Sequence, residues 1–211
     1  MTPPLLLYRD DGPLARAIGV ALPPLARVPH SLLTLVAIAP MFAVLVAMGD
    51  GASHALVGAV LAWLVVVAGA ASGAPPTDAF RWTVPPLLRL AEYAALLWIG
   101  ALAGESAQPA AFALICALTF HHYDLVYRLR NAGTEPPRWL GDLALGWDGR
   151  IVLGYILLVA SALPAGFFVA AGLLGAAFVA ESIAGWRRSG RAPRPGDGPA
   201  VVYEDEEDIV D

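Results

Sequence analysis

Six long apolar segments dominate the hydrophobic pattern of this chain. They cover residues 31–48, 54–72, 86–104, 110–127, 149–163 and 165–185. A helix needs about 20 predominantly apolar residues to cross a bilayer. Glycine, proline or acidic residues separate the first four segments, as expected at helix ends. The pattern predicts an all-α fold, an integral membrane bundle of six transmembrane helices over residues 31–185.

The boundary between the last two segments is weaker, because residues 151–185 are almost continuously apolar. The interruption from Ser161 to Gly166 fits either one kinked helix or a tight hairpin. Cytoplasmic loops carry the excess of positive residues in membrane proteins. With six spans all 13 cationic residues fall in cytoplasmic segments, whereas one merged span would put four arginines outside. The charges favour the hairpin and a multi-pass cell-membrane protein with both termini cytoplasmic.

The two ends of the chain differ from the bundle. Residues 1–30 form a cytoplasmic or interfacial segment, in which residues 12–27 fit an interfacial helix or a loop. Residues 186–211 are rich in Arg, Gly and Pro and then acidic, so they predict a disordered cytoplasmic tail. The run Leu5-Leu6-Leu7 is too short for the core of a cleaved leader.

Composition agrees with lipid as the solvent. Hydrophobic residues make up 58% of the 211 residues and charged residues 15%. The net charge of -5 arises mostly in the acidic tail, and no basic face for nucleic acid is visible. Small residues such as Gly100 and Gly104, at GxxxG spacing, fit close helix packing within the bundle or in a homodimer.

The end of the fourth segment carries the densest polar chemistry. His121, Asp124 and Arg128 recur at helical spacing and share one face. His121 and Asp124 are candidate ligands for a divalent metal such as Mg or Mn, and an Arg fork suits phosphate oxygens. The alternative is local pairing at a helix end, with Asp124 bonded to Arg128.

Glu92, Asp148 and Arg150 lie, like His121, at the predicted cytoplasmic ends of the helices. Ionisable groups within membranes are costly and therefore candidates for function. Because they all fall on the cytoplasmic side, we expect a polar pocket open to the cytoplasm. The candidate catalytic residues are Glu92, His121, Asp124 and Asp148, and the candidate phosphate-binding residues are Arg81, Arg128 and Arg150.

One short motif resembles a known enzyme signature. Asp11-Gly12-Pro13-Leu14-Ala15-Arg16 resembles the D-G-x-x-A-R opening of CDP-alcohol phosphatidyltransferases, a six-span family that binds divalent metal and CDP-activated lipid. That signature continues with two aspartates on the next helix, whereas the next acid here is Asp50, on the opposite side of the predicted membrane. The activity and site of that family are therefore not transferred.

Over residues 5–185 the chain is similar to an actinobacterial membrane domain of unknown function. The similarity is carried by the N-terminal Tyr8 to Leu14 run, the His121 to Arg128 motif and Gly146-Trp147-Asp148-Gly149-Arg150. That domain occurs fused to nucleotidyltransferase and CDP-alcohol phosphatidyltransferase domains. The resemblance implies membrane lipid and a CDP-alcohol phosphatidyltransferase as partners, in phospholipid headgroup biosynthesis.

The sequence is compatible with three functions. The chain binds or transforms a phosphorylated lipid or headgroup at the cytoplasmic face, with carboxylates and histidine as metal ligands or acid and base. Alternatively it is a non-catalytic membrane scaffold or partner subunit. A small transporter is the third reading, although the outer halves of the predicted helices are apolar.

The charge distribution generates a topology prediction. We expect a tag at either terminus to be protected from protease added outside intact cells, because both ends are predicted to be cytoplasmic. A tag in the loop at residues 49–53 should be cleaved in the same preparation. Cleavage of the C-terminal tag without cell lysis would contradict the six-span prediction.

Overall fold

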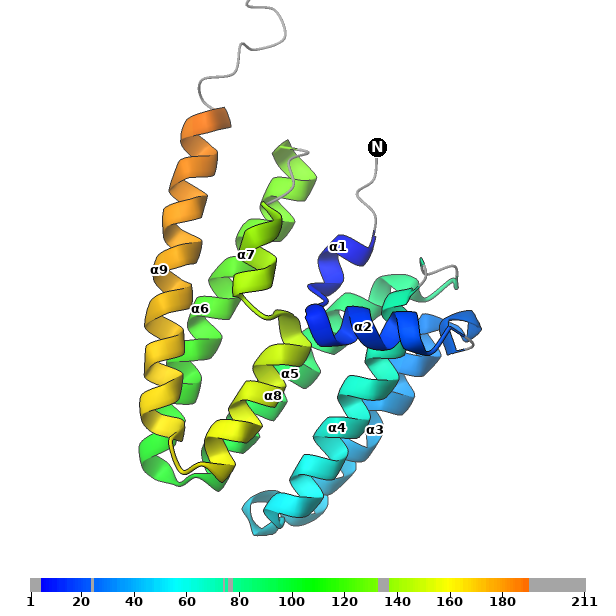
Figure 1. Cartoon of the computed structure of the whole chain (residues 1–211), viewed down its shortest axis with the longest axis vertical. Helices are drawn as coiled ribbons and strands as arrows, with labels where there is room; N and C mark the ends of the chain where they lie inside the picture. Colours follow the sequence, from blue (N-terminus) through cyan, green and yellow to red (C-terminus); the bar gives the residue numbers. More distant parts are fainter. Residues whose placement is uncertain (1–4, 24, 74, 76–77, 133–136, 190–211) are drawn as a thin grey trace, which may run out of the picture.

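The computed structural model describes residues 5–23, 25–73, 75, 78–132 and 137–189, and within them every regular element is helical (Figure 1). The α-helices are α1 (Leu5–Arg9), α2 (Pro13–Ala21), α3 (His30–Met48), α4 (His54–Ala70), α5 (Val84–Leu102), α6 (Gln108–Tyr127), α7 (Arg138–Leu143), α8 (Gly146–Val159) and α9 (Leu163–Ser189). Short 3-10 turns occur at η1 (Leu25–Arg27), η2 (Gly49–Gly51), η3 (Ala71–Gly73), η4 (Arg81–Thr83) and η5 (Glu105–Ala107), and a π-turn, η6 (Arg128–Ala132), extends α6.

The six apolar segments correspond to α3, α4, α5, α6, α8 and α9, with ends within a few residues of those predicted. Four helical stretches in the described part are long and apolar enough to cross a membrane: His30–Gly51, His54–Gly73, Glu105–Arg130 and Leu163–Arg188. Helices α5 and α8 are not among these four stretches, for separate reasons. Helix α5 contains Arg89 and Glu92, and α8 has only 14 residues.

The hairpin prediction for residues 151–185 is confirmed. Helix α8 ends at Val159 and α9 begins at Leu163, so the two are separate helices. Between them Ser161 adopts a left-handed backbone conformation with φ 53°. A left-handed residue breaks the α-helical hydrogen-bond ladder, which reverses the chain here without an interior proline kink.

The long helices form three antiparallel pairs, α3 with α4, α5 with α6, and α8 with α9 (Figure 1). Helices α5 and α8 contact each other and lie between α3–α4 and α6–α9. The turns within the pairs all lie at the lower end in Figure 1, while α1 and the end of α9 lie at the upper end. We call the end of the bundle away from these turns the polar end. The buried or half-buried Arg9, Arg89, Arg128 and Arg150 belong to it, because they lie at the end of α1, near the starts of α5 and α8, and directly after α6.

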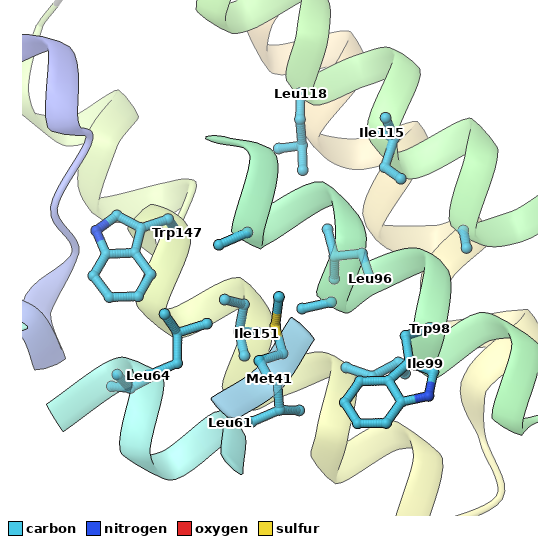
Figure 2. Packing of buried hydrophobic residues seen from close by; sticks show 14 of the residues in the cluster. Met41, Leu61, Leu64, Leu96, Trp98, Ile99, Ile115, Leu118, Trp147 and Ile151 are labelled. Atoms are coloured by element: carbon cyan, nitrogen blue, oxygen red, sulfur yellow. The ribbon is translucent and has the colours of Figure 1, made fainter. Parts of the chain in front are cut away.

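The apolar core forms where α5 and α8 meet the surrounding helices α3, α4, α6 and α9 (Figure 2). Met41 of α3, Leu64 of α4, Ile99 of α5 and Ile151 of α8 are each fully buried. Trp98 packs beside them and donates its indole N–H to the Gly49 carbonyl at 2.8 Å, which fixes α5 to the α3–α4 turn. Trp147 closes the core toward the polar end.

The N-terminal segment crosses the polar end instead of extending away from it. Residues 12–27, for which helix and loop were both open, contain the helix α2 and the turn η1. Helix α2 lies across the end of α4, with buried Ala15 against Gly69 of α4 and buried Gly19 against Gly73 of η3. At the other terminus α9 extends to Ser189, beyond the predicted end at residue 185, and the rest of the predicted disordered tail lies outside the described residues.

Two glycines allow the N-terminal segment to contact the start of α8. Gly146 has φ +63°, and a Cβ placed on it would lie 2.1 Å from the Gly12 nitrogen. A Cβ on Gly12 would in turn lie 1.9 Å from the Leu145 carbonyl oxygen. Only residues without a side chain permit this backbone contact, since such distances are far below van der Waals separation. The Asp-Gly and Gly-Trp-Asp motifs therefore meet in space.

We expect Gly146→Ala to destabilise the protein by about 1–3 kcal/mol, because alanine is strained at positive φ and its methyl group would displace Gly12. Thermal unfolding in detergent measures this effect. Gly141→Ala in α7 is the control, since a Cβ there meets nothing within 4 Å and alanine favours a helix. Equal unfolding temperatures for the two variants would show that the contact is not tight.

Candidate functional site

Asp10 lies at the centre of a buried charged cluster at the polar end. The cluster comprises this residue, from the loop between α1 and α2, with Arg89 and Glu92 from α5, His121 and His122 from α6, and Arg150 from α8. Asp10 has a left-handed backbone conformation, φ 55°, which is uncommon for a residue with a side chain. This conformation places a carboxylate from a peripheral loop among side chains of three long helices.

Arg150 is the most heavily paired member of the cluster. Its Nε donates to Glu92 Oε1 at 2.5 Å, and its Nη2 donates to Asp10 Oδ2 at 2.7 Å. Its Nη1 donates to the Ala144 carbonyl at 3.0 Å. The side chain is about 2% exposed and Glu92 is fully buried. Charges at this depth are tolerated because each is neutralised and hydrogen-bonded.

Arg89 pairs more loosely with the same carboxylates. Its Nη1 lies 3.5 Å from Asp10 Oδ2 and 3.6 Å from Glu92 Oε2. Both distances exceed those of a good hydrogen bond. Within the described residues neither Arg89 Nη1 nor Glu92 Oε2 has a hydrogen-bond partner. The other nitrogen, Nη2, donates to the Tyr8 carbonyl at 2.9 Å, so Arg89 also holds the N-terminal segment.

The two histidines complete the shell around Asp10. His122 Nε2 lies 3.3 Å from Asp10 Oδ2, and its Nδ1 is 2.7 Å from the Tyr93 hydroxyl. His121 Nε2 lies 4.0 Å from Asp10 Oδ1, and its ring stacks on Phe178 of α9 with centroids 4.1 Å apart. The consecutive histidines therefore both face the carboxylate, while their other contacts tie α6 to α5 and α9.

The electrostatic surroundings keep Asp10 ionised. Burial alone would raise the pKa of its carboxyl group, but Arg150, then the two histidines, and then Arg89 hold the pKa well below the ordinary value of 3.8. Stabilisation by this carboxylate is therefore complete above about pH 4 and is lost as the pH falls through the lower, folded-state pKa. At neutral pH Asp10 is a fixed negative charge.

A second set of contacts fastens the N-terminal segment to α8. Asp148 accepts hydrogen bonds from the backbone N–H groups of Gly12 at 2.6 Å and Ala15 at 2.9 Å, and so caps the start of α2. The Trp147 indole donates to Asp11 Oδ1 at 2.8 Å, and the Trp147 backbone N–H donates to the Asp10 carbonyl at 3.2 Å. Asp148 is thus a capping residue that satisfies orphan amides.

A separate polar cluster joins the ends of α6 and α9. Arg128 Nε pairs with Asp124 Oδ2 at 2.7 Å, and its Nη1 lies 2.7 Å from Glu181 Oε2. Asp124 Oδ1 also accepts from the Ser182 hydroxyl at 2.9 Å, and Glu181 accepts from Arg188 at 2.7 Å. These bonds hold α6 against α9.

The structure therefore divides the predicted site residues among four places. Glu92, His121 and Arg150 converge at Asp10, whereas Asp124 and Arg128 belong to the α6–α9 cluster. Asp148 caps α2, and Arg81 is exposed and bonds the Asp78 carbonyl. His121 and Asp124 engage different partners, so these two predicted metal ligands do not converge. Within the described residues no group of three or more His, Cys, Asp or Glu side chains is arranged to hold a metal ion, so these residues do not fit a bound Mg or Mn ion.

Asp10 and Glu181 were not predicted from the sequence as members of these clusters. Asp10 precedes the first apolar segment, and no periodicity connects it with Arg150, 140 positions later. Glu181 lies within the last apolar segment, where an isolated acid among hydrophobic residues was the available signal.

An apolar cavity of about 170 Å³ borders the cluster on the side of α9. Arg150 is the one charged residue in its lining, with Leu145 at the start of α8 and hydrophobic residues of α6, α8 and α9 around it: Leu114, Leu153, Phe167, Ala170, Leu173 and Leu174. Leu173 is 68% exposed, so the cavity lies next to the outer surface of α9. A larger apolar groove lies between the starts of α3 and α5.

Comparison with known proteins gives one match. A protein-family model described as Family of unknown function (DUF5941) matches residues 5–205, nearly the whole chain. No curated protein and no solved structure matches the chain. The family match agrees with the expected domain of unknown function and assigns no activity.

We expect Arg150→Met to lower the free energy of unfolding by about 3–5 kcal/mol, because it leaves Glu92 and Asp10 buried without their main counterion. Thermal or denaturant unfolding in detergent measures the loss. Arg16→Met is the matched control, since Arg16 and its partner Asp142 are more than half exposed and such pairs contribute about 0–1 kcal/mol. Similar losses in both variants would mean that the buried cluster does not hold the helices together.

Proposed function

We propose that this chain, which belongs to the family of unknown function DUF5941, is a six-span membrane subunit that binds a phosphorylated lipid or headgroup at the cytoplasmic face. In this proposal it serves a partner enzyme of phospholipid headgroup biosynthesis and does not catalyse the reaction itself. The biosynthetic context, an actinobacterial source and a CDP-alcohol phosphatidyltransferase partner follow from the sequence resemblance and are part of the proposal.

One observation carries the non-catalytic reading: each candidate catalytic acid is already engaged by the chain itself. Glu92 pairs with Arg150, Asp124 pairs with Arg128 and Ser182, and Asp148 caps α2. A general acid or base must lie within hydrogen-bond reach of a substrate. These carboxylates instead bind partners within the chain. The arrangement is that of polar groups that join helices.

Six spans are supported by how α5 and α8 bury their charges. Arg89, Glu92 and Arg150 would be costly against lipid, but they pair with one another and with Asp10 inside the bundle. Helix α5, with 19 residues, extends about 28 Å at 1.5 Å per residue, and α8 about 21 Å. A span shorter than the bilayer core is accommodated by local thinning.

Binding of a phosphorylated ligand is supported by the guanidinium groups at the polar end. Arg27, Arg81, Arg130 and Arg187 are exposed there. Phe80 and Trp82 flank Arg81 and are each more than 60% exposed, as is typical of aromatic residues at a membrane interface. Cationic and aromatic side chains at one level suit a layer of anionic headgroups.

Catalysis is the second candidate function, and one observation favours it. Glu92 is fully buried, and its Oε2 has no hydrogen-bond partner among the described residues. A carboxylate with an unused oxygen, in a cluster that also contains two histidines, has the residue types of an acid–base site.

Asp124→Asn tests the predicted catalytic role of Asp124, because it keeps the shape of the side chain and removes its charge. In cells that lack the endogenous gene, we expect the variant to restore incorporation of labelled headgroup precursor to within about twofold of wild type. A catalytic role would instead lower the rate by orders of magnitude, since each 1.36 kcal/mol of transition-state stabilisation is about tenfold. Incorporation is measured per amount of inserted protein.

Asp142→Asn is the matched control, because it makes the same change at an exposed acid. A loss of about a hundredfold in Asp124→Asn alone, with normal insertion, would contradict the non-catalytic proposal. Unchanged incorporation when the gene is deleted would contradict the role in phospholipid biosynthesis.

A further inference from the structure

The buried cluster has the composition of an anion-binding site that already contains an anion. Two guanidinium groups and two imidazoles from α5, α6 and α8 surround the Asp10 carboxylate. The same donors bind phosphate oxygens, and Arg in particular binds carboxylate and phosphate with similar geometry. The Arg and His donors lie on long helices, whereas Asp10 lies in the loop between α1 and α2.

Charge balance allows one anion to replace another at this position. Arg89 and Arg150 are balanced by Glu92 and Asp10, so withdrawal of Asp10 leaves one guanidinium charge without a counterion. A buried charge needs a partner, and the negative charge of a phosphate ester would supply it. Arg89 Nη1 is also buried with no hydrogen-bond partner in the described part of the chain. That donor is available to an additional oxygen.

The neighbouring cavity indicates what is attached to the phosphate. Arg150 belongs both to the cluster and to the lining of the 170 Å³ apolar cavity between α6, α8 and α9. In another protein an engineered apolar cavity of about 150 Å³ stays dry and binds benzene, a small hydrocarbon. Because exposed Leu173 lies in this lining, the cavity borders the surface that faces lipid in the six-span arrangement. A molecule with a phosphate at Arg150 and a hydrocarbon chain in the cavity is a phospholipid.

We propose that Arg89, Arg150, His121 and His122 bind the phosphate of a membrane lipid whose acyl chain enters the cavity between α6, α8 and α9. Asp10 occupies this phosphate site when no lipid is bound, and lipid binding displaces it together with the adjacent N-terminal segment. The inference rests on the proposed function and names its ligand class and its binding site.

Displacement has a defined structural consequence. The Trp147 backbone N–H donates to the Asp10 carbonyl, and this bond breaks if residue 10 leaves the cluster. Competition from Asp10 also lowers the apparent affinity of the wild-type protein, because lipid binds only the fraction of molecules whose site is vacant. Removal of the Asp10 carboxylate should therefore strengthen lipid binding.

The test measures equilibrium binding of dioctanoyl phosphatidic acid to the purified full chain in zwitterionic detergent. We expect Asp10→Ala to bind at least about tenfold more tightly than wild type, because the internal competitor is removed. Asp10→Asn keeps the side-chain volume and covers the case in which the alanine variant does not fold. Asp142→Ala, which removes an exposed acid, should bind like wild type. Leu153→Trp, which fills the cavity, should abolish the gain in the Asp10 variants.

Two comparison ligands test whether binding requires both the phosphate and the acyl chains. Dioctanoylglycerol has the acyl chains without phosphate, and an equal gain with it would overturn the phosphate site. Inorganic phosphate has no acyl chain, and an equal gain with it would overturn the role of the cavity. In the wild-type protein, saturating phosphatidic acid should increase hydrogen exchange of the Trp147 amide, and unchanged exchange would overturn displacement of Asp10.

Equal affinity of wild type, Asp10→Asn and Asp142→Ala for phosphatidic acid would overturn the proposal as a whole. The measurement uses the isolated chain without a partner enzyme. Its failure is therefore distinct from failure of the proposed function, which is judged by headgroup incorporation in cells.

Discussion

The neutralisation of Arg150 by Glu92 and Asp10 is the interaction on which the rest of the structure depends. A guanidinium group that is about 2% exposed inside a helical bundle must have counterions, since the cost of an unpaired buried charge is several kcal/mol. Glu92 supplies one carboxylate from α5 and Asp10 supplies the other from the N-terminal loop. One side chain therefore fixes α8 against α5 and recruits a segment that lies outside the bundle.

The position of the N-terminal segment follows from this requirement. Asp10 can reach Arg150 because its backbone is left-handed and because Gly12 and Gly146 allow the two backbones to touch. Asp148 then caps α2, and Arg89 binds the Tyr8 carbonyl. Polar contacts and close backbone geometry hold the segment near the cluster, and α2 also packs against α4 through Ala15 and Ile18. A ligand that satisfies the same cations would release it, which is the physical basis of the proposed lipid site.

The two polar clusters differ in the lengths of their contacts and in whether they border a cavity. The α6–α9 cluster joins acids and arginines of adjacent helix ends, and its contacts are short. The Asp10 cluster joins three helices and a loop, borders an apolar cavity through Arg150, and includes the loosely paired Arg89. Short pairs stabilise helix packing, even though Arg128 Nη2 and Glu181 Oε2 have no hydrogen-bond partner among the described residues. The longer contacts of Arg89 lie beside a cavity and leave a donor for a ligand. For this reason the Asp10 cluster is the site of interest.

The sequence by itself determined the helical class, the six apolar helices, their ends and the separation of α8 from α9, because hydrophobic length and glycine, proline and charge signals are local. It also identified Glu92, His121 and Arg150 as unusual, since ionisable residues stand out in apolar segments. Only the tertiary structure decided which of them meet. Asp10 contacts Arg150 across 140 positions, and Asp124 on the same helix as His121 instead pairs toward α9. Such partners are chosen by how whole helices pack and by the need to neutralise each buried charge, which no short stretch of sequence encodes.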